Sequence, residues 1–153
     1  MSKIPTLAVP FGRGANALHK WAAGQLEEGV PRGVLYLSIL NSPIPSDADE
    51  MRAGQELERE IGGVMVNRNL EGRAAEKATA TDRAIELYEA NVADRFDGSH
   101  PYERLRIIYA GERQYADAIR ICETYLQGVA VDPELCESFK RWIRKYHMHV
   151  QSA

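Results

Sequence analysis

The sequence contains one pattern that recurs at a fixed interval. Residues 84–89 read Ala-Ile-Glu-Leu-Tyr-Glu, and residues 118–123, thirty-four positions later, read Ala-Ile-Arg-Ile-Cys-Glu. Thirty-four residues is the period of a repeat built from two helices joined by a turn. Such a repeat cannot bury its apolar face alone, so it stacks on neighbouring helices and leaves one surface open. The interval therefore predicts an all-α fold and a function in binding.

The segment between the two copies carries further residues at informative spacing. Tyr102 is followed by Leu105 and Tyr109, and the small residue Ala118 comes nine positions after the last of them. This pattern resembles the tetratricopeptide repeat (TPR). The resemblance implies that Leu105 and Tyr109 lie on the first helix of a pair, and that the second helix crosses it at Ala118. The sequence departs from the family at Arg106, Cys122 and Tyr125.

The chain of 153 residues is long enough for one domain with a sizeable core. We expect N-terminal helices over residues 1–62 and a short TPR-like array of antiparallel helix hairpins over 63–147. The array is clearest over residues 79–127, its last helix caps the open end, and residues 148–153 form a tail.

Local signals place the helix boundaries. Serine and acids at 46–49, and Thr79 to Asp82, are typical of helix N-caps. The buried stripe expected on the helix after residue 46 is Met51, Leu57, Ile61 and Met65, and Gly62-Gly63 is a point at which it could bend. The apolar run 34–40 fits either a buried strand or a buried helix. We favour a helix with Pro31 in its first turn, because only residues 6–9 could pair with a strand.

Composition excludes several classes of protein. A net charge of −3 argues against a nucleic-acid binder driven by bulk charge. No apolar run approaches the roughly 20 residues of a membrane span, and the N-terminus lacks the apolar core of a signal peptide. We therefore expect a cytoplasmic protein, in which Cys122 and Cys136 act as small buried hydrophobes rather than as a disulfide.

The resemblance also implies a binding surface, because the first helix of each TPR pair lines a groove. Stepping by the period gives the expected groove residues: Arg73, Lys77, Glu103, Arg104, Ile107, Arg141, Arg144 and Lys145. Cations outnumber acids in this set, and arginine binds a carboxylate through two parallel hydrogen bonds. The expected function is a non-catalytic protein-interaction module that takes an acidic peptide or a chain-terminal carboxylate.

Two other readings rest on short motifs. The basic helix with Arg141, Arg144 and Lys145 could touch nucleic-acid phosphates, and Gly12-Arg13-Gly14 before a helix could hold a phosphate on backbone amides. The third glycine of a dinucleotide fingerprint is missing from the latter. His147 and His149 are too few to close a metal site. We expect no catalytic residue, cofactor or metal, and short repeat arrays with exposed ends also allow self-association.

Overall fold

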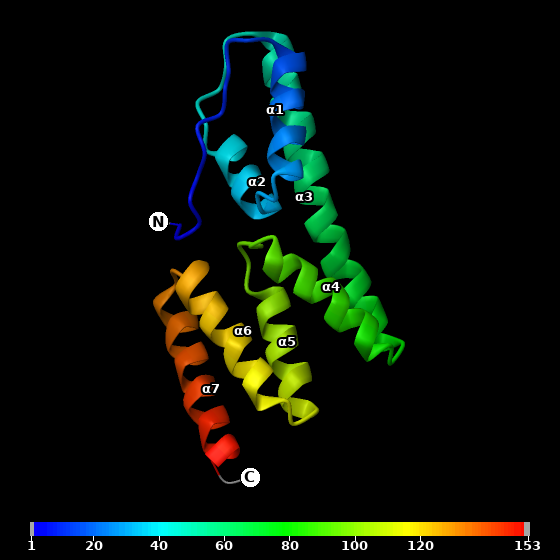
Figure 1. Cartoon of the computed structure of the whole chain (residues 1–153), viewed down its shortest axis with the longest axis vertical. Coiled ribbons are helices and arrows are strands. Elements are labelled where there is room, and N and C mark those ends of the chain that lie inside the picture. The colour runs from blue at the N-terminus through cyan, green and yellow to red at the C-terminus, as the bar shows by residue number, and fades with distance from the viewer. Residues whose placement is uncertain (1, 152–153) are drawn as a thin grey trace.

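A computed structural model describes residues 2–151, which form seven helices and no strand. The predicted all-α class is confirmed, and residues 34–40 are helical. Figure 1 shows the order of the helices along the chain. Their bounds are α1 (Ala15–Glu27), α2 (Arg32–Leu40), α3 (Ala48–Lys77), α4 (Thr81–Ala93), α5 (His100–Gly111), α6 (Tyr115–Gly128) and α7 (Pro133–Gln151).

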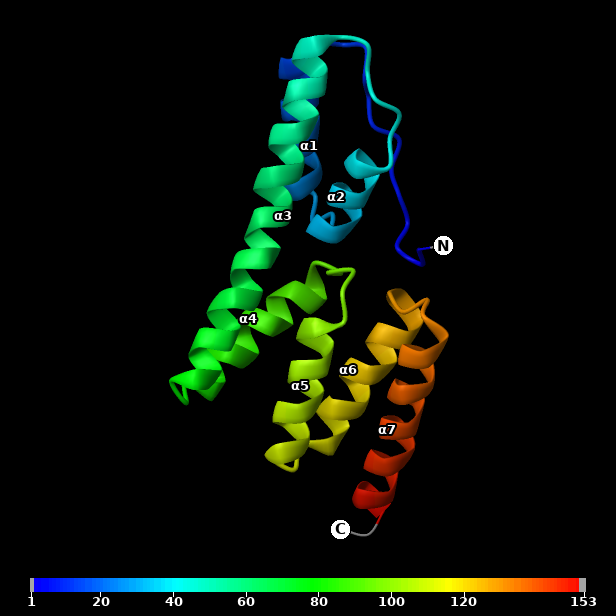
Figure 2. The same ribbon diagram turned by 180° about the vertical axis from the view of Figure 1, so that it is seen from behind.

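The long helix α3 connects the two halves of the molecule. Helices α1 and α2 pack on its first half, and α4 packs on its second half; α5, α6 and α7 follow, each beside its predecessor (Figures 1 and 2). The buried side chains accordingly form two clusters. The N-terminal cluster contains Leu18, Ala22, Leu35, Ile39, Ala53, Leu57 and Ile61. The C-terminal cluster is larger and includes Tyr88, Tyr102, Leu105, Ile121, Cys122 and Phe139.

The possible bend at Gly62-Gly63 does not interrupt the helix, because α3 is one helix of 30 residues that crosses this point. The expected boundary between residues 62 and 63 therefore falls inside a helix. Gly62 has a packing role instead. A β-carbon there would lie 3.0 Å from the ring of Tyr36 on α2, so the glycine lets the two helices approach closely.

The first turn of α3 differs in detail from the expectation. Asp47, not Ser46, is the N-cap, and its carboxylate accepts a hydrogen bond of 2.9 Å from the amide of Glu50. Met51 is 39% exposed and so does not belong to the buried stripe, whereas Glu50 is buried. At α4 the N-cap is Ala80, which supplies no side-chain cap, so the second predicted capping signal is also wrong.

The N-terminus of α2 is capped by a residue that lies far away in the sequence. The Asp94 carboxylate accepts a hydrogen bond of 3.0 Å from the amide of Arg32, and the Asp94 carbonyl accepts one of 2.7 Å from the amide of Gly33. The same carboxylate pairs with the guanidinium groups of Arg32 and Arg68. Asp94 thus joins α2, α3 and the end of α4 at one point.

This junction gives folding stability a specific pH dependence. Burial raises the pKa of the Asp94 carboxyl, but hydrogen bonds from Arg32 and Arg68 outweigh it and hold that pKa below its ordinary value. A carboxyl with a lowered folded pKa stabilises the fold above its unfolded pKa of about 4, and this stabilisation is lost as pH falls through the folded pKa. We therefore expect the urea midpoint of Asp94→Asn to fall less steeply below about pH 4 than that of the wild type.

The matched control for that measurement is Asp49→Asn, whose carboxylate is 75% exposed. It should keep the wild-type pH profile. If Asp94→Asn also keeps that profile, the Asp94 network does not stabilise the fold.

The N-terminal arm before α1 ties the two halves together. Ile4 is buried in the C-terminal cluster, and the amide of Leu7 donates a hydrogen bond of 2.8 Å to the hydroxyl of Ser38 on α2. The Lys3 ammonium donates to the carbonyl of Leu126 on α6 at 2.6 Å. The arm runs along α2 towards α6 and α7, as both views of the ribbon show (Figures 1 and 2).

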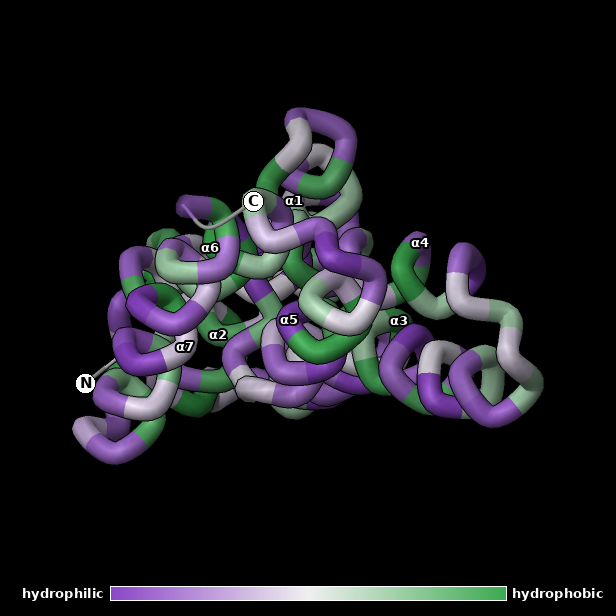
Figure 3. The backbone as a smooth tube through the Cα atoms, turned by 90° about the horizontal axis from the view of Figure 1, so that it is seen from below, coloured by the Kyte–Doolittle hydropathy of each residue, from purple (hydrophilic) through white to green (hydrophobic). Residues whose placement is uncertain are grey.

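Helix α7 covers the open end of the C-terminal cluster. The Phe139 ring is fully buried and lies 4.5 Å, between centroids, from that of Tyr125 on α6. The Arg106 guanidinium lies 4.3 Å from the Trp142 ring centroid and donates a 3.0 Å hydrogen bond to the Tyr146 hydroxyl. Figure 3 shows that α7 carries both hydrophilic and hydrophobic residues. An amphipathic helix has its apolar residues three and four positions apart, as Leu135, Phe139 and Trp142 are.

The expected tail at 148–153 is corrected in part, because α7 continues through Gln151. His149 stacks on the ring of Tyr115 at a centroid distance of 4.8 Å. Residues 152–153 lie outside the described residues.

Ala84 and Ala118, which begin the two copies of the repeated pattern, are both fully buried. Tyr88 and Cys122, four residues after each alanine, are also fully buried. Burial raises the pKa of the Cys122 thiol to about 12, in keeping with its expected role as a small hydrophobe. Because no space surrounds a fully buried alanine in a packed core, we expect Ala118→Leu to destabilise the fold by about 1–3 kcal/mol. Chemical denaturation measures this, and an unchanged midpoint would show that Ala118 is not tightly packed.

Candidate partner-binding face

A hollow of about 490 Å³ opens between the end of α3 and the start of α5. We call it the basic hollow, and its lining consists of Arg73, Glu76, Lys77, His100 and Arg104. Three of these residues were expected in the groove, because the period of the repeat placed Arg73, Lys77 and Arg104 on one surface. Three cations face a single acid.

The acid of the basic hollow is already fully engaged. Nε of Arg104 lies 3.1 and 3.2 Å from the two Glu76 carboxylate oxygens, and Nη2 lies 2.6 Å from one of them. The Tyr88 hydroxyl donates a further hydrogen bond of 2.6 Å. Burial raises the pKa of Glu76, but these bonds outweigh it and lower that pKa overall, so the group is an anion near neutral pH.

Because of this ion pair with Glu76, a substitution of Arg104 affects folding as well as ligand binding. Replacing Arg104 by glutamate would set a second carboxylate beside the buried one of Glu76 and would destabilise the fold as well as any complex. Arg104 contributes mainly to the joint between α3 and α5. Its Nη1 atom has no acceptor within residues 2–151 and remains available to a ligand.

Arg73 and Lys77 carry the unneutralised charge of the basic hollow. Both are exposed, and neither has an ion-pair or hydrogen-bond partner in the described part of the chain. They lie four residues apart on α3, so their side chains point from the same face of that helix. A negatively charged group of a ligand would therefore meet two cations that form no ion pair with any acid among the described residues.

His100 forms the floor of the hollow beside these cations. Its Nε2 atom is buried and has no hydrogen-bond partner among residues 2–151, while its ring lies edge-on to Tyr88 at 5.6 Å. Burial and the neighbouring charges of Arg73 and Arg104 lower the pKa of His100 below its ordinary value. The imidazole is thus neutral near pH 7 and adds no charge to the basic hollow.

Exposed apolar side chains flank the basic hollow on both helices. Leu70 lies one turn before Arg73 on α3 and is 56% exposed. Ile107 lies one turn after Arg104 on α5 and is 40% exposed. A surface with a charged centre and apolar flanks fits a peptide that carries both acidic and apolar residues.

The other expected groove residues do not line the basic hollow. Glu103 binds the guanidinium of Arg106 at 3.2 Å. The ammonium of Lys145 lies 5.0 Å from the Trp142 ring centroid, which gives it a local partner. Arg141 and Arg144 are exposed on α7 without an ion-pair partner in the described residues.

Two residues of the hollow were not anticipated from the sequence. Glu76 precedes Lys77 in a charged stretch, and only the fold shows that it turns inward to Arg104 and Tyr88. His100 is the first residue of α5. The Pro101 that follows was a usable signal, because proline favours the first turn of a helix.

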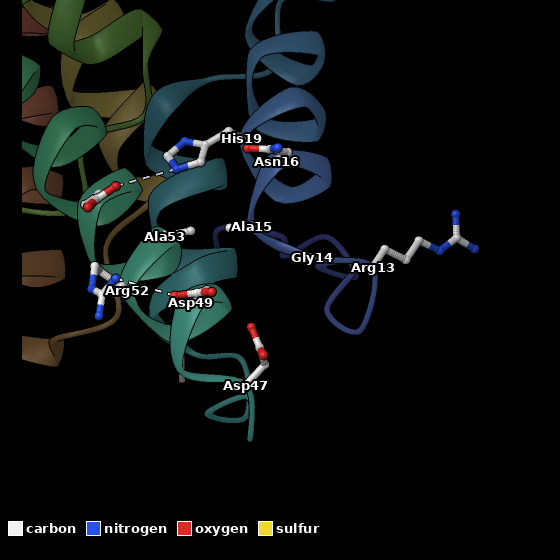
Figure 4. Close-up of a pocket in the computed structure, with 10 residues that line it drawn as sticks. Arg13, Gly14, Ala15, Asn16, His19, Asp47, Asp49, Arg52 and Ala53 are labelled. Atoms are coloured by element: carbon white, nitrogen blue, oxygen red, sulfur yellow. Dashed lines mark hydrogen bonds and ion pairs between the residues drawn. The ribbon is translucent and has the colours of Figure 1, made fainter.

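The glycine turn before α1 does not form a phosphate cradle. The amide of Gly12 donates a hydrogen bond of 2.7 Å to the carboxylate of Glu50, so it is already occupied. The adjoining polar hollow is lined by the acids Asp47, Asp49 and Glu56 together with Arg13 and Arg52, and Arg52 pairs with Asp49 at 3.4 Å. Figure 4 shows the Arg13 side chain directed away from these acids.

Among the described residues, no helix combines the length and the apolar content needed to cross a membrane. Comparisons with models of protein families, with curated proteins and with solved structures found no match to this chain.

Proposed function

We propose that this protein is a non-catalytic interaction module that binds an acidic, partly apolar segment of another protein on the face formed by α3 and α5. The observation that carries the proposal is the basic hollow, in which Arg73 and Lys77 lack partners while the only acid, Glu76, is bound by Arg104 and Tyr88. The protein would act as an adaptor rather than as an enzyme.

A TPR-like arrangement of the helices is part of this proposal. It takes α3–α4 and α5–α6 as two hairpins and α7 as the capping helix. Gly72, one period before Arg106, supports it, because the family prefers a small residue at that position. Gly72 is buried, and a β-carbon there would lie 2.5 Å from the nearest atom of the Tyr88 ring on α4. Arg106, in the second helix pair, thus departs from the small residue that the family prefers, whereas Gly72, at the equivalent position of the first pair, matches it.

The chemistry of the face favours an acidic peptide over nucleic acid. On the face formed by α3 and α5, the unpaired cations Arg73 and Lys77 lie in a small area beside exposed Leu70 and Ile107, rather than in a stripe that could follow a phosphate backbone. Apolar side chains would anchor a peptide, while the cations would orient its carboxylates.

The test is fluorescence anisotropy with a labelled peptide made of glutamate and leucine. We expect it to bind the wild-type protein and to bind Arg73→Glu/Lys77→Glu at least about tenfold more weakly, a change of about 1.4 kcal/mol. Both substituted side chains are exposed, so the melting temperature should change little. Binding should also weaken as salt is raised, because the charges are exposed.

The control is Lys20→Glu, which makes one such charge reversal, half of the charge change of the double variant, at an exposed position of α1. It should bind like the wild type, and a peptide with lysine in place of glutamate should not bind. If Lys20→Glu and the double variant lose binding equally, net charge and not the position of the cations determines binding. The proposal that the peptide binds on the face formed by α3 and α5 would then be wrong.

A further inference from the structure

The loop between α2 and α3 presents a strongly exposed apolar side chain. Ile44 is 81% exposed, more than any other large apolar residue that the structure describes. It stands between Pro43 and Pro45, whose rings restrict the backbone of the loop. A side chain held by a stiff loop loses little conformational freedom when it binds.

Ile44 belongs to a patch rather than standing alone. Leu40 is 47% exposed and Met51 is 39% exposed, and both line the same small hollow as the loop. We call this patch the Ile44 tip; it consists of Leu40, Pro43, Ile44, Pro45 and Met51. Contiguous exposed apolar side chains of this kind mark a surface that another molecule covers.

Acidic residues follow the tip directly. Asp47 and Asp49 come three and five residues after Ile44, and both are exposed. Asp49 has only a long contact of 3.4 Å with the exposed Arg52. The segment thus combines an apolar anchor with nearby carboxylates, which is the chemistry that the basic hollow and its flanks would accept.

The tip cannot reach the basic hollow of its own chain. Asp49 and Lys77 lie at opposite ends of α3, and a rise of about 1.5 Å per residue over the intervening residues separates them by about 42 Å. Figure 1 shows the loop into α3 and the end of α3 at opposite ends of this helix. Only the tip of a second copy can occupy the basic hollow.

We propose that the Ile44 tip of one copy docks on the basic hollow of a second copy, so that the protein associates head to tail. The occupant of the proposed binding face is then this chain itself, and the inference rests on the proposed function. Each copy carries one tip and one hollow. Two different surfaces therefore meet, and such a contact extends into chains unless its rotation closes a ring.

Sedimentation velocity of the full-length protein tests this. The average mass of the wild type should rise with protein concentration, and this rise should be lost at high salt, which screens the charges on both surfaces. Two variants should each remain monomeric at every concentration: Ile44→Ser, which alters the tip, and Arg73→Glu/Lys77→Glu, which alters the hollow. Lys20→Glu should associate like the wild type.

The decisive sample is an equal mixture of the two monomeric variants. Ile44→Ser retains an intact hollow and the double variant retains an intact tip, so the mixture should form a dimer and nothing larger. A mixture that stays monomeric would overturn the inference, as would a double variant that associates like the wild type.

The outcomes also separate this inference from the proposed function. If the wild type stays monomeric while the glutamate–leucine peptide binds the basic hollow, the inference is wrong and the proposed function stands. If the peptide fails to bind Ile44→Ser, whose hollow is intact and unoccupied by another copy, the proposed function itself fails. Thermal melting should show that Ile44→Ser folds like the wild type, because the side chain is exposed.

Discussion

A chain that ends after Val131, and so lacks α7, is expected to lose cooperative unfolding and to aggregate. The truncation removes the fully buried Phe139 and the buried Tyr146, and it uncovers Tyr125 on α6. Burial of one such side chain stabilises a fold by about 1.5–3 kcal/mol, so the loss approaches the total stability of about 5–15 kcal/mol of a small protein. The truncation also uncovers Arg106, which loses Trp142 and Tyr146 as partners.

Urea denaturation followed by circular dichroism measures this effect, together with sedimentation to detect aggregates. The matched control is Arg141→Ala in the full-length chain, because Arg141 is an exposed residue of the same helix. It should stay within about 0.5 kcal/mol of the wild type. A truncated chain that is soluble and has the wild-type midpoint would show that α7 does not cover the C-terminal cluster.

Gly33→Ala is expected to destabilise the fold although it lies in a helix. In an exposed helix interior, replacing glycine by alanine stabilises by up to about 1 kcal/mol. At Gly33 a β-carbon would lie 2.6 Å from the carbonyl oxygen of Asp94 and would meet that of Arg95 more closely still. The backbones would have to separate, which breaks the 2.7 Å hydrogen bond between Gly33 and Asp94. We expect a loss of about 1–3 kcal/mol from overpacking, increased by about 1 kcal/mol for that bond.

Gly24→Ala is the matched control, because a β-carbon at that position of α1 would have no neighbour within 4 Å. It should leave the fold unchanged or slightly more stable. The two variants therefore move the urea midpoint in opposite directions. If Gly33→Ala also raises the midpoint, the close contact between α2 and the end of α4 is absent.

The presence of the helices could be predicted from the sequence, because it depends on the spacing of apolar residues within each short segment. The run 34–40 was ambiguous, and it is a helix that packs against α3, α1 and the arm, where a strand would have no partner. The packing of the Tyr36 ring over Gly62 could not be predicted, because it joins residues far apart in the sequence. Propensity disfavours glycine in a helix, and packing between α2 and α3 outweighs that preference.

Within the candidate site, only the residues related by the 34-residue interval could be predicted from the sequence. The interval placed Arg73, Lys77 and Arg104 on one surface, and the basic hollow brings these three together. It could not show that Glu76 neutralises Arg104, because that pair joins residues far apart in the sequence. The tip at Ile44 was also missed, because a proline-rich loop gives no sign of how far its side chains protrude.

The most direct test of the proposed binding face is the mapping of amide chemical shifts by nuclear magnetic resonance. The glutamate–leucine peptide is titrated into labelled Ile44→Ser protein, so that no second copy competes for the basic hollow. We expect the largest shifts at residues 66–77 of α3 and 100–107 of α5, and little change in α1 and α2. Shifts that are absent, or that concentrate on α1 and α2, would contradict the assignment of the partner-binding face to α3 and α5.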